Sequence, residues 1–164
     1  MDRTLGSAAY SYDRDRRDWL ILLIAFEGAP RGLDPVRLQK GLFLFAKETD
    51  VPADQKYRFR AYNYGPMSKG IYDDVDELVA SGLVDSVAVE GQSWSRYRPT
   101  VSGVSRGREV LELAQERHPR AAQHLYDIKS SVASMTFDSL LEDVYERYPD
   151  YAVQSVFRRR SSSV

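Results

Sequence analysis

Hydrophobic residues recur at helical spacing in the N-terminal half of the chain and predict three helices. The first covers Asp13 to Phe26, and the second begins at Asp34, a favourable cap, with Pro35 at the first helical position. The apolar positions of the second helix are Val36, Leu38, Leu42, Phe43 and Phe45. The third helix has an apolar stripe of Ile71, Val75, Leu78 and Val79. An aromatic strand is expected between the second and third helices.

Turn-forming residues frame the third helix. Tyr64, Gly65 and Pro66 predict a tight turn before it, Ser68 is placed to cap it, and Gly82 to end it. Residues 83–89 then read as a strand, 90–93 as a turn and 94–99 as the return strand, with Thr100 to Gly103 opening the next helix. Helix, helix, turn, helix and hairpin in this order are typical of a winged helix.

The C-terminal third is predicted to be helical. Two helices are expected over 104–115 and 120–135, and Thr136 should cap a third that ends before Pro149. Its apolar face is formed by Leu140, Leu141, Val144 and Tyr145. The fold class is therefore mainly α (α+β), with a flexible leader (1–12), a winged-helix-like core with a small antiparallel sheet (13–103), a C-terminal helical extension (104–157) and a disordered tail (158–164). Exposed aromatics near the end of the C-terminal extension favour a homodimer, and they are Tyr145, Tyr148, Tyr151 and Phe157.

Composition limits the chemistry. The chain has 164 residues, no cysteine and a formal net charge of −1. Disulfides, thiolate metal sites and cysteine nucleophiles are therefore excluded, and no overall basic field draws the protein to nucleic acid. The apolar run Trp19 to Phe26 is too short to span a bilayer, and the N-terminus lacks a signal-peptide core, so we expect a cytoplasmic protein without membrane contact.

Catalytic signatures are absent from the sequence. It contains no nucleophile elbow, phosphate-binding loop, zinc-protease motif or dinucleotide fingerprint. His118 and His124 lie in a polar region without a paired carboxylate signature, and a nuclease built on Asp73, Asp76, Glu77 and a lysine would need those groups to converge in a cleft. We expect no enzyme activity, no catalytic residue, no metal and no cofactor.

The acidic run on the third helix is the candidate protein-binding surface. Helical geometry places Asp73, Asp76 and Glu77 away from the apolar stripe, and Lys69 and Tyr72 accompany them. A DNA-reading helix would bring these carboxylates against phosphates spaced one charge per ~1.7 Å of duplex. A basic protein partner suits them better than DNA does. The structural interpretation of the same residues is a plain solvated helix face, and a divalent metal site is a further alternative.

Nucleic-acid binding has a separate set of candidates. Arginines alternate with other residues on the predicted strands and would share a face beside an aromatic side chain, which suits phosphate contact or base stacking. The structural interpretation is that these arginines pair with nearby acids across the sheet. The charged start of the first helix, DRDRRD, is expected to be a solvated first turn, with a phosphate-contacting patch as the alternative. The candidates for double-stranded DNA are Arg58, Arg60, Lys69, Trp94, Arg96 and Arg98.

Two short motifs carry a family resemblance. Leu38-Gln39-Lys40 ahead of an aromatic helix, and Tyr64-Gly65-Pro66 ahead of an acidic helix ending in Gly82-Leu83-Val84, resemble the SocA-type antitoxin (Panacea) domain and short bacterial and phage proteins with the same motifs. The segment 140–155 is similar to one in the second group, and the resemblance covers roughly residues 15–155. It implies a small, non-catalytic, mostly helical domain that neutralises a toxin, adapts a partner for proteolysis or acts in phage defence.

Both motifs also have a structural interpretation. Gln39 and Lys40 lie between apolar positions and are expected to satisfy backbone carbonyls of a neighbouring strand, because buried polar groups need partners. Tyr64-Gly65-Pro66 is expected to set the backbone conformation. The leading hypothesis is a protein-interaction module of the antitoxin or defence-regulator kind, and the alternative is a winged-helix transcription regulator that binds DNA.

Overall fold

The computed structural model describes residues 15–27 and 31–156, and it is mainly helical. Six α-helices occur in these ranges: α2 (Asp15–Ala25), α3 (Pro35–Glu48), α4 (Lys69–Ala80), α5 (Val101–Arg117), α6 (Pro119–Ser134) and α7 (Phe137–Arg147). Two short 3₁₀ helices, η1 (Ala53–Gln55) and η2 (Pro149–Ala152), complete the helical part. The expected leader (1–12) and tail (158–164) lie outside the described residues.

Two small antiparallel sheets accompany the helices. Strands β1 (Arg60–Tyr62) and β2 (Gly65–Met67) form one hairpin, and β3 (Val84–Ala88) and β4 (Ser95–Pro99) form the other. Leu33, just before α3, adds a bridge to the second hairpin through two backbone hydrogen bonds with Tyr97, of 2.9 and 2.8 Å. The chain segment between α2 and α3 is therefore fastened to β4.

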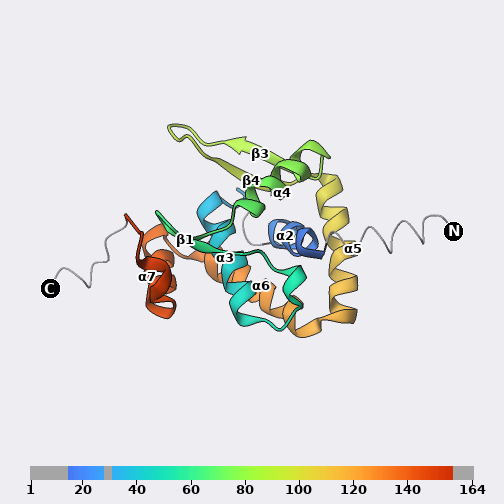
Figure 1. Cartoon of the computed structure of the whole chain (residues 1–164). Coiled ribbons are helices and arrows are strands. Elements are labelled where there is room, and N and C mark those ends of the chain that lie inside the picture. The colour runs from blue at the N-terminus through green and yellow to red at the C-terminus, as the bar shows by residue number, and fades with distance from the viewer. Residues whose placement is uncertain (1–14, 28–30, 157–164) are drawn as a thin grey trace.

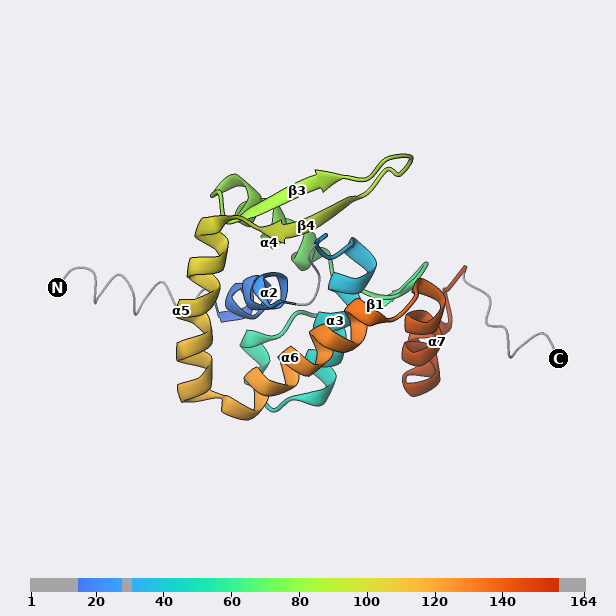
Figure 2. The ribbon, with the colours of Figure 1, turned by 180° about the vertical axis from the view of Figure 1, so that it is seen from behind.

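Helix α2 lies at the centre of the molecule. Residues Trp19 to Ile24 are all buried, as expected for a helix that is apolar on every side. Figures 1 and 2 show α2 between α5 on one side and α3 with α6 on the other, with the β3–β4 hairpin above and α7 at the end away from α5. The hairpin and α4 lie on the side of the molecule away from α6.

The C-terminal helices belong to the same core. Leu140, Leu141 and Val144 are fully buried and join the cluster that contains α2 and α3. Tyr145 is 1% exposed, so the expectation that it would offer an exposed aromatic for dimerisation is wrong. It faces inwards because it lies one helical turn after Leu141, on the apolar side of α7.

Most predicted helix ends agree with the structure, with three differences. Asp34 and Thr136 cap α3 and α7 by accepting the backbone N–H groups of Arg37 and Ser139. Helix α5 is longer than the predicted 104–115, and α6 begins at Pro119. Ser68 lies at the cap position of α4, but its side chain makes no capping hydrogen bond, so that prediction is wrong.

No helix within the described ranges has the length and apolar character needed to cross a membrane.

Candidate interaction surface

Helix α4 presents one apolar and one polar face. Ile71, Val75 and Leu78 point into the core, whereas the expected partner-binding positions are exposed. Among the described residues, Asp73 and Asp76 form no ion pair. Their charge is therefore open to a partner. The exposed positions are Lys69, Tyr72, Asp73, Asp76 and Glu77.

The other two acids of α4 hold the helix in place. Asp74 is buried and accepts hydrogen bonds from the Tyr57 hydroxyl at 2.7 Å and from Arg16 Nε at 3.0 Å. Glu77 pairs with Arg17 at 2.9 Å. Burial, reinforced by the charge of Asp74, raises the pKa of Tyr57 and keeps its hydroxyl protonated as the donor. The arginines at the start of α2 are therefore engaged with α4, which corrects the expectation of a solvated first turn.

Exposed aromatic side chains lie beside these free carboxylates. Tyr62 on β1 is 40% exposed and Tyr72 on α4 is 38% exposed. Burial is the main cause that raises the pKa of Tyr72, and the nearby Tyr62 raises it further. Burial is also the main cause that raises the pKa of Tyr97, and Asp76 and Tyr72 add to this rise. Tyr72 and Asp76 are one helical turn apart and lie on the same side of α4. We call the surface formed by Tyr62, Lys69, Tyr72, Asp73 and Asp76 the α4 face.

The two sequence motifs meet beneath this surface. Gln39 Nε2 donates to the Ser68 carbonyl at 3.0 Å, and the Ser68 N–H donates to Gln39 Oε1 at 2.8 Å. Lys40 Nζ donates to the Pro66 carbonyl at 3.0 Å, and burial lowers the pKa of Lys40 to about 7. Both side chains thus satisfy backbone groups around β2, in agreement with the structural interpretation of the Leu38-Gln39-Lys40 motif.

Gly65 explains the second motif. Its φ of +89° lies in the left-handed region that favours glycine. A Cβ at this position would lie 2.8 Å from Cε1 of the buried Tyr145. Tyr64 is 45% exposed and its ring packs edge-on against Phe137, while Pro66 is buried. The motif therefore brings the β1–β2 hairpin against α7.

The nucleic-acid candidates divide between two places. Arg96 lies over the Trp94 ring at 5.8 Å, and Arg98 is opposite Asp85 in the β3–β4 register. Alternation along β4 directs these two arginines away from the face that carries Tyr97. Arg60 instead stacks on Tyr62 at 4.8 Å beside the α4 face. Arg58 is exposed but precedes β1, so the predicted shared strand face of Arg58 and Arg60 does not form as a strand.

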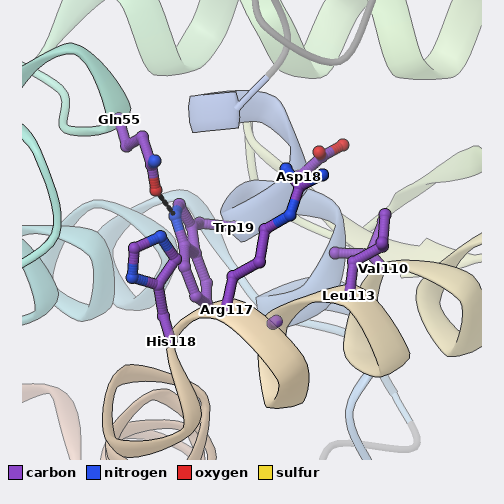
Figure 3. A pocket seen from close by; sticks show the side chains of 8 residues that line it. Asp18, Trp19, Gln55, Val110, Leu113, Arg117 and His118 are labelled. Carbon is purple, nitrogen blue, oxygen red and sulfur yellow. Dashed lines mark hydrogen bonds between the residues drawn. The ribbon is translucent and has the colours of Figure 1, made fainter. Parts of the chain in front are cut away.

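Hollows indent other parts of the described surface. Figure 3 shows a small one, where the His118 ring lies beside Trp19 and the Arg117 side chain extends toward Asp18. The Trp19 indole donates to Gln55 Oε1 at 2.9 Å, and the space of about 50 Å³ suits one or two water molecules. It is far smaller than the ~300–1,000 Å³ of typical ligand pockets.

Two larger hollows are lined by residues whose described contacts include ion pairs and ring packing. One, of about 430 Å³, lies between the end of α3 and the start of α6, where Glu48 accepts from His124 and from Arg147, each at 2.6 Å. Another, of about 420 Å³, lies beside Phe26 and Tyr126. Within the described ranges, no group of three His, Cys, Asp or Glu side chains converges as a metal site would require.

The buried positions of Lys129 and Asp74 were not predicted from the sequence. Lys129 is 1% exposed and its Nζ donates to the carbonyls of Leu23, Ile24 and Phe26 at the end of α2. Asp74 belongs to the acidic run but turns inward. Comparison of the chain with protein-family models, with curated proteins and with solved structures gave no match.

Proposed function

We propose that this protein is a non-enzymatic interaction module that binds another protein through the α4 face. The observation that carries the proposal is the coincidence of exposed tyrosines with unpaired carboxylates on one side of α4. Tyrosine is enriched where proteins bind one another, because its ring buries a large area and its hydroxyl accepts polar partners. Charged groups left unpaired there select a partner of opposite charge.

The order of elements supports a winged-helix-like fold as part of this proposal. In that arrangement α2, α3 and α4 are the three helices, and the β3–β4 hairpin is the wing. The bridge between Leu33 and Tyr97 supplies the short strand that such folds place between their first two helices. Helix α4 then occupies the position of the helix that reads DNA in many winged-helix regulators.

The charge of α4 argues for a protein partner at that position. Asp73 and Asp76 would face phosphate groups if α4 entered a major groove, and like charges would repel. A basic protein surface is favourable instead. With the resemblance to Panacea domains, this suggests an antitoxin, an adaptor for proteolysis or a phage-defence regulator, whose partner is a toxin, a protease component or a defence protein.

Charge reversal on α4 tests the proposal. We expect Asp73→Lys combined with Asp76→Lys to abolish partner binding, lowering recovery at least about tenfold, because repulsion replaces attraction at two adjacent positions. Cross-linked partners of the tagged protein would be quantified by mass spectrometry. The matched control is Glu112→Lys with Glu116→Lys, which makes the same charge change on two exposed positions of α5. Equal recovery with both double variants would refute the assignment of the α4 face.

DNA binding by the wing is the alternative function, favoured by the stacking of Arg96 on Trp94. Fluorescence anisotropy with a mixed-sequence duplex at about 50 and 200 mM salt separates the two functions. The protein-binding proposal predicts no micromolar binding at the lower salt. If binding occurs, the alternative predicts that Arg96→Ala weakens it and reduces the slope of log affinity against log salt by about one.

A further inference from the structure

Tyr72 lies on a helix whose start is held by a buried side chain. Gln39 is 2% exposed, and its amide makes a two-way hydrogen-bonded pair with the backbone of Ser68, the residue directly before α4. Tyr72 follows in the first turn of α4 and is 38% exposed. The backbone that carries this ring is therefore fixed, which lowers the entropy cost of binding.

One helical turn further on, α4 supplies a carboxylate on the same side. Asp76 follows Tyr72 at the i+4 spacing that makes side chains neighbours on a helix. Asp76 has no ion-pair partner within the described residues, in contrast to Glu77, which Arg17 engages. The neighbouring ring of Tyr62 is covered by Arg60 at 4.8 Å. Tyr72 and Asp76 therefore form an exposed aromatic ring and a carboxylate without an ion-pair partner on the same side of α4.

The buried side of α4 also combines a tyrosine with a carboxylate, and there an arginine contacts both. Arg16 lies over the Tyr57 ring at 4.7 Å and donates through Nε to Asp74 at 3.0 Å. The Tyr57 hydroxyl is fixed by its own hydrogen bond of 2.7 Å. A fixed phenol, a carboxylate of α4 and a guanidinium are thus an arrangement that this fold already forms. On the exposed side, Tyr72 and Asp76 are present, and no described arginine or lysine pairs with Asp76 or lies over the Tyr72 ring.

We propose that Tyr72 and Asp76 form a binding site for an arginine side chain of the partner protein. The guanidinium stacks on the Tyr72 ring while its N–H groups donate to the Asp76 carboxylate. Arginine fits better than lysine because its planar group stacks on aromatic rings and makes two parallel hydrogen bonds to a carboxylate. Asp73 adds favourable charge at the edge. This inference rests on the proposed function and specifies the chemistry of the partner.

Two labelled peptides of equal charge test the site, nona-arginine and nona-lysine. Fluorescence anisotropy with the full-length protein at about 150 mM salt should give an affinity about tenfold higher for nona-arginine. Tyr72→Leu should remove this preference and leave the weaker, charge-driven binding of both peptides. Asp76→Asn should weaken both. Tyr126→Leu, at a tyrosine of α6 that is 45% exposed compared with 38% for Tyr72, is the matched control and should change neither affinity.

The outcomes separate this inference from the function on which it rests. Equal binding of the two peptides, no binding of either, or an arginine preference that survives in Tyr72→Leu would each overturn the arginine site. The charge-reversal experiment on Asp73 and Asp76 does not depend on arginine selectivity. A protein that loses its partner on charge reversal but shows no arginine preference would retain the proposed function and lack this site.

Discussion

Replacing Gly103 with alanine should lower the free energy of unfolding by about 3 kcal/mol or more. Gly103 lies in the first turn of α5, and a Cβ there would be 1.9 Å from the backbone carbonyl oxygen of Leu83. That carbonyl accepts the N–H of Thr100, whose side chain in turn accepts the N–H of Gly103. The clash is with backbone, so relief requires α5 to move away from the start of β3 and to lose these bonds.

Urea denaturation of the purified variant measures this effect. Ser102→Ala is the matched control because Ser102 is an exposed neighbour in the same turn, and its effect should stay within about 0.5 kcal/mol. The midpoint of Gly103→Ala should fall with little change in the slope against urea. If Gly103→Ala were as stable as the control, the close packing of α5 against β3 would be wrong.

Local signals in the sequence were sufficient to predict the helices and most of their ends. Asp34 and Thr136 were recognised because a cap and the N–H that it accepts lie three residues apart. Ser68 fits the same local rule, yet its hydroxyl does not cap α4. Its backbone is held on both sides by Gln39, 29 residues earlier, and no local pattern reports that contact.

Two buried charged residues, Asp74 and Lys129, could not be predicted for the same reason. Asp74 finds Arg16 across 58 residues, and Lys129 finds the end of α2 across more than 100. These partners lie far apart in the sequence and follow no regular spacing, so a local sequence pattern does not predict either contact. Tyr145 is different, because its i+4 spacing from Leu141 already placed it on the apolar face of α7.

The candidate site divides in the same way. Helical periodicity correctly turned Tyr72, Asp73 and Asp76 toward solvent, because it fixes which positions oppose the apolar stripe. Periodicity also correctly predicted that Glu77 is exposed, but its ion pair with Arg17 of α2 depends on the packing of the two helices and could not be predicted.

Stability should rise as the pH increases from about 7 to about 9, and Lys40→Met should remove about 2 kcal/mol of that rise. Burial lowers the pKa of Lys40 to about 7, from 10.5 as its ordinary value. In this range the folded protein has released the proton while the unfolded chain still holds it. The unfolded state then binds more protons, so the free energy of unfolding increases with pH. Below pH 7 the folded protein holds a buried ammonium group, and the whole desolvation penalty lowers the free energy of unfolding.

Lys129 gives this experiment its internal comparison. Burial lowers the pKa of Lys129 to about 8, so its share of the rise begins about one pH unit higher, and Lys129→Met should remove only the later part. Urea denaturation at closely spaced pH values distinguishes the two onsets. Measurements stop near pH 9 because tyrosines with raised pKa values, such as Tyr57, oppose the rise above about 10. A Lys40→Met profile parallel to that of the unsubstituted protein would mean that Lys40 keeps its proton, and that the Pro66 carbonyl accepts from an ammonium group rather than from a neutral amine.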